Sequence, residues 1–161
     1  EIVIPDQIID YTSGRKGTFF EGNGSAVTHV DFTEPYDHEL RRRIAEAGAA
    51  LGIAMKSGGV YAATQGPRLE TAAEINRLER DGCDLVGMTG MPEAVLAREL
   101  GLPYAAISVV ANHAAGRGSS AKGIHFESLD NVLQEAMGRV RAVIEELVGF
   151  AAQGRGSGIS A

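Results

Sequence analysis

The chain alternates short apolar runs with longer segments in which apolar residues recur every three or four positions. The short runs are bounded by proline, glycine or polar residues, which is typical of strands. They lie at residues 1–6, 26–32, 56–67, 83–89 and 102–112. The last of these runs is almost continuously apolar, as expected of a strand that is covered on both faces of its sheet. The polar, glycine-rich stretch between the first two runs predicts a mobile loop.

The longer segments carry the period of amphipathic helices. We expect helices that close at a glycine over residues 38–52, 70–82 and 91–101, and a long helix over residues 129–147. Asp37 is a good N-cap for the first of them, because its short carboxylate can accept a hydrogen bond from the first turn. Residues 151–161 are rich in glycine and predict a flexible tail, so we assign residues 1–150 to one domain.

Strands and helices therefore alternate, which favours an α/β fold in which helices cover both faces of a sheet. Polar residues follow three of the expected strands, at residues 65–70, 87–91 and 112–116. Ligands of such folds bind at the carboxyl ends of strands. We therefore predict that the three junctions form one site.

The composition is that of an ordinary folded protein, because 44% of the 161 residues are hydrophobic and 22% are charged. The formal net charge of -6 argues against a nucleic-acid surface. Cys83 is the single cysteine, which excludes an intrachain disulfide, and the four histidines show no metal-ligand spacing. No apolar run reaches the length of a bilayer span, and the first residues do not form a signal peptide. We expect a cytoplasmic protein without a metal, a nucleic-acid partner or a membrane partner.

Three polar residues at the junctions offer chemistry. Glu70 can stabilise the start of a helix, or it can accept a hydrogen bond from a ligand N–H group. Thr89 can cap a turn, or it can hold an anion together with backbone N–H groups. Asn112 can form a turn, or its carboxamide can bind the edge of a heterocycle. Residues 116–121, GRGSSA, fit a dinucleotide-binding fingerprint, but no helix or suitably spaced acidic residue follows them.

Three ordered segments, HVDFTEPYD at 29–37, GGVYAATQGPRLETAAE at 58–74 and the stretch 82–112 that begins GCDLVGMTGMPE, resemble the purine nucleoside phosphorylase and methylthioadenosine phosphorylase family. The resemblance implies a three-layer α/β fold with a mixed, mostly buried sheet flanked by helices, assembled as a homotrimer. It also implies reversible phosphorolysis, in which inorganic phosphate is the co-substrate and no metal or organic cofactor takes part. Within the family, we expect a 6-oxopurine 5'-methylthionucleoside as the substrate.

The resemblance assigns roles to the three polar residues. Glu70 matches the glutamate that accepts a hydrogen bond from purine N1–H in the 6-oxopurine branch. Asn112 matches the asparagine that contacts N7 and O6 and stabilises the leaving base. Thr89 matches a hydroxyl that binds phosphate. The adenine-specific branch has a serine and an aspartate at the positions of Glu70 and Asn112, so the resemblance implies hypoxanthine nucleosides.

Further positions match the family's base and ribose pockets. Met88 matches a methionine that packs on the ribose, and Val86 and Gly87 match residues that line the base pocket. Leu69 stands where a phenylalanine is usual beside the base, which is a departure from the family pattern.

Two more residues match positions at the sugar end of the family's substrate site. Leu129 stands where the inosine and guanosine branch has a histidine that binds the 5'-hydroxyl, so an apolar residue there suits a methylthio group. His29 is expected beside the 5' substituent of a neighbouring subunit's nucleoside.

Two alternatives stay open at this point. The first is a general inosine or guanosine phosphorylase. The second is a non-catalytic purine-binding fragment, because the chain opens on EIVIPDQ without an initiator methionine and shows no counterpart of the family's N-terminal phosphate-binding loop.

Overall fold

The computed structural model describes residues 1–22, 24, 26–124 and 129–154, with side chains described up to residue 124 and from 132 to 149. These residues form strands β1 (Ile2–Ile4), β2 (Gln7–Asp10), β3 (Lys56–Ser57), β4 (Val60–Ala63), β5 (Leu85–Gly87) and β6 (Ser108–Val109). They also form helices α1 (His38–Ala50), α2 (Ala72–Arg80), α3 (Glu93–Glu99) and α4 (Leu129–Gly154), and a 3-10 turn at Gly118–Ser120.

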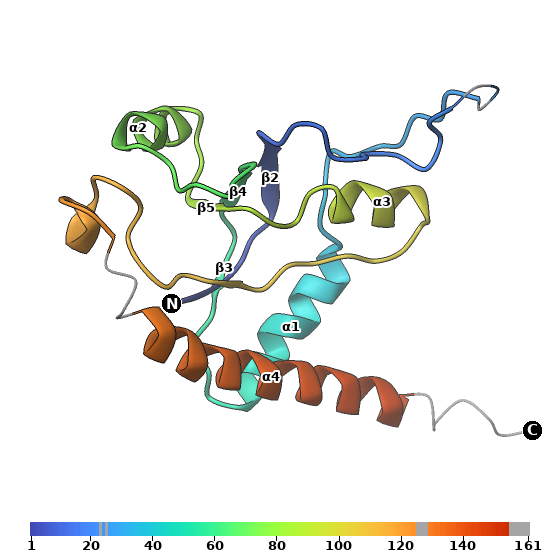
Figure 1. The fold of residues 1–161 in the computed structure, drawn as a ribbon. Helices are drawn as coiled ribbons and strands as arrows, with labels where there is room; N and C mark the ends of the chain where they lie inside the picture. The colour runs from blue at the N-terminus through green and yellow to red at the C-terminus, as the bar shows by residue number, and fades with distance from the viewer. Residues whose placement is uncertain (23, 25, 125–128, 155–161) are drawn as a thin grey trace, which may run out of the picture.

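The strands form two small sheets, in the orders β3-β1-β6 and β2-β4-β5. The second sheet is entirely parallel, whereas β1 pairs in parallel with β3 and antiparallel with β6. Figure 1 shows α1 and α4 below the strands, and α2 and α3 on either side of β2, β4 and β5. The expected α/β class is therefore confirmed as mixed sheets flanked by four helices among the described residues.

The two sheets are joined by a bend that two neighbouring chain segments make together. Pro5 ends β1, and the Asp6 N–H then donates to the Gly59 carbonyl at 3.1 Å while the Asp6 carboxylate accepts from the Gly59 N–H at 2.9 Å. Gly58 and Gly59 have φ values of 93° and 122°, which only glycine adopts readily. Residues 2–10 and 56–63 consequently run side by side through both sheets.

Helices α1 and α4 cover the first sheet. Helix α1 begins after Asp37, whose carboxylate accepts the Leu40 N–H at 2.7 Å, as the sequence predicts. Its buried residue Ile44 packs with Ile4 of β1 and with Val143 of α4.

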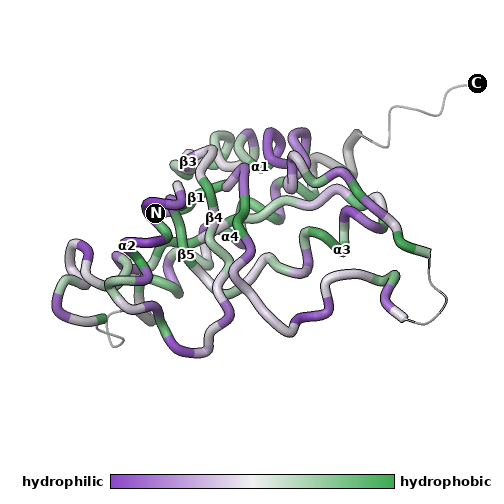
Figure 2. Tube along the Cα trace, turned by 90° about the horizontal axis from the view of Figure 1, so that it is seen from above, coloured by the Kyte–Doolittle hydropathy of each residue, from purple (hydrophilic) through white to green (hydrophobic). Residues whose placement is uncertain are grey.

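The second sheet carries its helices on opposite faces of β4. Tyr61 and Ala63 pack in the cluster that includes Ala94 of α3, whereas the intervening Ala62 packs with Ile75 of α2. This follows from the two-residue period of a strand, in which successive side chains point to opposite faces. Figure 2 shows that hydrophobic stretches gather where β1, β4 and β5 lie.

Several expectations about elements are wrong. Residues 26–32 form no strand, because this apolar run finds no pairing partner and stays part of the loop before α1. In the run 102–112 only β6 pairs, and the expected run 56–67 contains two strands that belong to different sheets. Strand β2 was not expected, and α4 continues to Gly154, into the stretch expected to be a tail.

Among the described residues, no helix combines the length and the apolarity needed to cross a membrane.

Candidate active site

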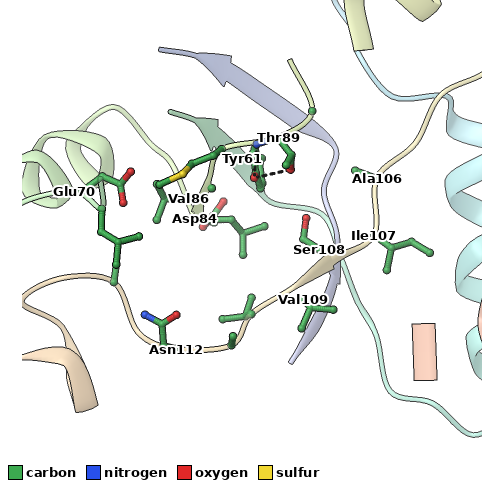
Figure 3. Close-up of a pocket in the computed structure, with 18 of the residues that line it drawn as sticks. Tyr61, Glu70, Asp84, Val86, Thr89, Ala106, Ile107, Ser108, Val109 and Asn112 are labelled. Carbon is green, nitrogen blue, oxygen red and sulfur yellow. Dashed lines mark hydrogen bonds between the residues drawn. The ribbon is translucent and has the colours of Figure 1, made fainter. Parts of the chain in front are cut away.

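A cavity of about 620 Å³ lies beside the carboxyl end of β5 and is bounded by the loop after β4 and by the segment around β6. This volume is within the usual range for small-molecule sites. Seven of the nine residues expected at the site line it: Leu69, Glu70, Val86, Gly87, Met88, Thr89 and Asn112. Figure 3 shows Glu70 and Asn112 at one end of the cavity and Thr89 with Tyr61 at another. The three junctions therefore meet, although the roles of the residues stay predictions.

Glu70 does not lie in the first turn of α2, contrary to expectation. The helix is capped by Thr71, whose hydroxyl accepts the Glu74 N–H at 3.1 Å while the Glu74 carboxylate accepts the Thr71 N–H at 2.7 Å. Arg68 also pairs with Glu74 at 2.7 Å and, with the Thr71 N–H, lowers the pKa of Glu74 to about 2. Glu74 thus serves the start of the helix, which removes that explanation for Glu70.

The carboxylate of Glu70 is oriented by the end of β4. The Thr64 hydroxyl donates to Glu70 Oε1 at 2.7 Å, and the Thr64 N–H donates to the Gly87 carbonyl at 2.7 Å. Glu70 is therefore linked, through one side chain, to the strand pair that forms the floor of the cavity.

Thr89 is oriented by a tyrosine that the sequence analysis did not identify. The Tyr61 hydroxyl lies 3.2 Å from Thr89 Oγ1 and accepts the Thr89 N–H at 3.5 Å. Tyr61 comes from β4, and it reaches Thr89 because Gly87 has no side chain where the tyrosine hydroxyl lies. The hydroxyl of Thr89 is consequently held in the cavity by a neighbouring strand.

Arg15 is a second residue that the sequence analysis missed. Its guanidinium donates to the carbonyls of Thr64 at 3.3 Å, Gln65 at 3.2 Å and Met88 at 3.0 Å, and also to the Met91 carbonyl. It therefore joins the loops after β4 and β5. Backbone carbonyls carry no sequence signal, so these contacts could not be read from the residues around Arg15.

Asn112 follows β6 and reaches the cavity from the other sheet. Its carboxamide Nδ2 donates to the His113 carbonyl at 2.7 Å. The loop that follows is tied to α2, because Arg117 donates to Glu79 at 2.6 Å and to Asn76 at 2.7 Å. The residues 116–121, considered above as a dinucleotide fingerprint, form part of this loop and contain only a 3-10 turn.

Tyr36 and Tyr104 form part of the cavity wall, with ring centroids 6.1 Å apart and an interplanar angle of 19°. Burial raises the pKa of both phenols, and their mutual proximity adds to the effect for Tyr36. Both rings therefore stay neutral at physiological pH and give the cavity a partly aromatic lining.

Two expected residues are not brought to this cavity. His29 is exposed on the loop before α1 and does not line the cavity of its own chain. Leu129 is the first residue of α4, but its side chain lies outside the described part of the structure. Their roles at the sugar end stay predictions.

Residues 1–149 match the family model described as Phosphorylase superfamily. A probable S-methyl-5'-thioinosine phosphorylase of Pseudomonas syringae pv. tomato is 52% identical over 145 residues, which are 90% of this chain and 58% of that protein. The 6-oxopurine nucleoside phosphorylase of Pyrococcus furiosus is 44% identical over 149 residues, which are 89% of this chain and 56% of that protein. The chain thus spans less than two thirds of the length of these curated relatives.

The fold has counterparts among solved structures. Methylthioadenosine phosphorylase from Schistosoma mansoni in complex with adenine superposes with a TM-score of 0.87 at 25% identity, over 95% of this chain and 59% of that chain. The sheets and helices described above therefore have the arrangement of a nucleoside phosphorylase. By the family match over nearly its whole length, the chain belongs to the phosphorylase superfamily.

Proposed function

We propose that this chain forms the base-binding side of an enzyme that cleaves 5'-methylthioinosine with phosphate, giving hypoxanthine and 5-methylthioribose 1-phosphate. The observation that carries the proposal is that Glu70, which Thr64 orients, and Asn112 line the same cavity. The names of the similar bacterial and archaeal proteins support the same substrate class.

The base end of the cavity suits a 6-oxopurine. Such a base presents a donor at N1 and an acceptor at O6, whereas adenine presents an acceptor at N1 and a donor at N6. An ionised Glu70 can only accept, so it pairs with the first pattern and opposes the second. Because a buried polar group without a partner is costly, this mismatch discriminates strongly between the two bases.

Phosphorolysis follows from the positions of three groups. A phosphate oxygen forms a bond to C1' of the sugar while the bond from C1' to N9 breaks and its electron pair moves into the purine. The carboxamide of Asn112 donates to N7 and stabilises this charge. Its Nδ2 carries two protons, so one can stay on the His113 carbonyl while the other is donated to N7. Thr89, oriented by Tyr61, donates to the phosphate. The rate arises from positioning and electrostatics, without a covalent enzyme intermediate.

We extend the proposal to the assembly and the co-substrate. Inorganic phosphate is the second substrate, and no metal or organic cofactor is required. The active form is a cytoplasmic homotrimer, in which His29 lies beside the 5' substituent bound to a neighbouring subunit.

Phosphate-dependent release of hypoxanthine from 5'-methylthioinosine tests the proposal, with inosine and 5'-methylthioadenosine as the competing substrates. Methylthioinosine should be preferred over both. Equal turnover of inosine would favour the general inosine phosphorylase, and preference for methylthioadenosine contradicts the assignment of Glu70. Calorimetry with hypoxanthine and adenine tests base selection separately, and hypoxanthine binding without turnover would favour the non-catalytic alternative.

The substitution Glu70→Gln tests the residue that selects the base. A glutamine amide can turn to donate to N1 of adenine, so the ratio of hypoxanthine to adenine affinity should fall by about tenfold or more. Glu39→Gln removes an exposed carboxylate on α1 and is the matched control, for which the ratio should stay unchanged. An unchanged ratio in Glu70→Gln contradicts the proposed role.

A further inference from the structure

We propose that Thr64 is a specificity-determining residue, which holds one oxygen of the Glu70 carboxylate so that the other stays available to the N1–H of a 6-oxopurine. The inference rests on the proposed base selection by Glu70 and adds the residue that sets its orientation. Thr64 does not touch the substrate cavity, so it acts as a positioning residue.

The backbone fixes where the Thr64 hydroxyl lies. Thr64 directly follows β4, and its N–H donates to the carbonyl of Gly87 at the end of β5 at 2.7 Å. Arg15 also donates to the Thr64 carbonyl at 3.3 Å. Both backbone groups of Thr64 are thus engaged, which leaves the side chain little freedom to follow a moving carboxylate.

The hydroxyl approaches Glu70 from the side away from the base cavity. Thr64 lines a second, smaller cavity of about 280 Å³, together with Tyr11, Gln65 and Arg68. Glu70 lines both cavities, so it lies where the two adjoin. A hydrogen bond from the rear holds the carboxylate without occupying the space that a base needs.

Proton counting assigns the direction of this hydrogen bond. The Thr64 hydroxyl has one proton and lies 2.7 Å from Glu70 Oε1 and 3.2 Å from the Gly87 carbonyl. An ionised carboxylate is acceptor-only, and a donor prefers the shorter, charge-assisted contact. The proton therefore lies toward Glu70, and one oxygen of the carboxylate is committed to Thr64.

The polar neighbours of Glu70 along the chain form hydrogen bonds with Glu74. Arg68 pairs with the Glu74 carboxylate at 2.7 Å, and the Thr71 hydroxyl accepts the Glu74 N–H at 3.1 Å. Among the described residues, the hydrogen bond that holds the Glu70 carboxylate comes from Thr64, which lies on a different segment from helix α2.

Calorimetric titration of hypoxanthine and adenine into the whole chain tests the proposal. Thr64→Val keeps the shape of the side chain but removes the hydroxyl, whereas Thr64→Ser keeps the hydroxyl. The ratio of hypoxanthine to adenine affinity should fall by about tenfold in the valine variant and return in the serine variant, since hydrogen bonds to charged groups are of that strength. Thr12→Val removes a hydroxyl that lines neither cavity and should leave the ratio unchanged.

The outcomes separate this proposal from the proposed function. A parent protein that binds both bases equally overturns base selection by Glu70 and, with it, the role of Thr64. A hypoxanthine preference that Thr64→Val retains overturns the role of Thr64 alone. Equal loss of affinity for both bases also overturns it, because a merely structural role would give that result. If circular dichroism shows that the valine variant is unfolded, Thr64→Ala supplies the same comparison.

Discussion

A pair of hydroxyls joins strand β4 to the loop after β5. The Tyr61 hydroxyl lies 3.2 Å from Thr89 Oγ1 and also receives the Thr89 N–H at 3.5 Å. A hydroxyl can accept and donate, so when Tyr61 donates to Thr89 the proton of Thr89 is left for an anion. The hydroxyl oxygen of Tyr61 on β4 therefore orients the Thr89 hydroxyl, the group proposed to bind phosphate.

Removal of that oxygen should affect phosphate and spare the base. We expect Tyr61→Phe to weaken phosphate affinity about three- to tenfold, the usual strength of a neutral hydrogen bond, without changing the ratio of hypoxanthine to adenine affinity. Calorimetry with phosphate and with both bases measures the two effects. Tyr11→Phe is the control, since the Tyr11 hydroxyl bonds to Asp81 outside the main cavity. Equal losses for phosphate and hypoxanthine would show that Tyr61 acts on the fold as a whole.

Arg15, which lies on a loop rather than on a helix or strand, connects the loops that follow β4 and β5. Its guanidinium binds carbonyls of the loop after β4, at Thr64 and Gln65, and of the loop after β5, at Met88 and Met91. A planar guanidinium presents several donors in fixed directions, which suits four carbonyls on two loops. Arg15 therefore holds the segments that carry Glu70 and Thr89 at a constant separation.

Loss of this cation should loosen both loops. In Arg15→Met, hypoxanthine affinity should fall about tenfold or more, and amide exchange should quicken at residues 64–70 and 88–91 together. Arg15→Lys should not restore either property, because one ammonium group cannot reach the same four carbonyls. Arg42→Met, which removes an exposed ion pair on α1, is the control. Rescue by lysine would mean that only the positive charge matters.

A carboxylate at the start of helix α2 should make the stability of the protein depend on pH. Arg68 and the Thr71 N–H hold the pKa of Glu74 at about 2, below its ordinary value of 4.5. A lowered pKa in the folded state means that this carboxylate adds stability above pH 4.5, and that the contribution is lost as the pH falls toward 2. Urea unfolding at several pH values should show this loss in the parent protein but not in Glu74→Gln. The same slope in both would exclude Glu74 as its source.

The contribution of the Thr71 N-cap to the free energy of unfolding can be measured. Thr71→Ala removes the hydroxyl that accepts the Glu74 N–H, and we expect it to lower the free energy of unfolding by ~1 kcal/mol. Thr71→Ser should recover most of that loss, as measured by urea unfolding. An alanine variant as stable as the parent would mean that the Arg68 and Glu74 pair is sufficient at this helix end.

The whole molecule divides into a packed half around β1, α1 and α4 and a half around β4 that carries most of the cavity. Ile4 is completely buried between Ile44 and Val143, whereas Val148 on α4 is 61% exposed. Ile4→Ala should therefore cost roughly 2–5 kcal/mol of stability, and Val148→Ala less than about 0.5 kcal/mol. Thermal unfolding measures the difference. The hypoxanthine to adenine ratio should survive Ile4→Ala at temperatures where the variant is folded.

The sequence predicts local features of this molecule well. Asp37 and the stripe through Ile44 are sufficient to place α1, because capping and helical periodicity act over a few residues. Glu70 and Thr89 could be expected to meet, since each follows a strand and β4 and β5 are parallel neighbours. The apolar run at 26–32 misleads because strand formation depends on a neighbour that the local pattern does not contain.

The sequence does not predict the residues that orient the site from a distance. Arg15 acts on carbonyls 49 to 76 positions away, and Tyr61 meets Thr89 at a separation of 28. Neither contact leaves a periodic or compositional trace. Asn112 reaches the cavity from a strand of the other sheet. Its place was predicted from its position after an apolar run, whereas its role was inferred only from the family resemblance.

Because Gly87 leaves space for the Tyr61 side chain, substitutions at positions 87 and 61 should depend on each other. A Cβ atom added at Gly87 would overlap the Tyr61 hydroxyl and would also lie 2.9 Å from the ring carbon Cζ. A change from Tyr61 to phenylalanine therefore does not make room for alanine at position 87. Across natural variants, any residue larger than glycine there should occur only with a small side chain at position 61, and such sequences should have replaced the orienting partner of Thr89 by another route.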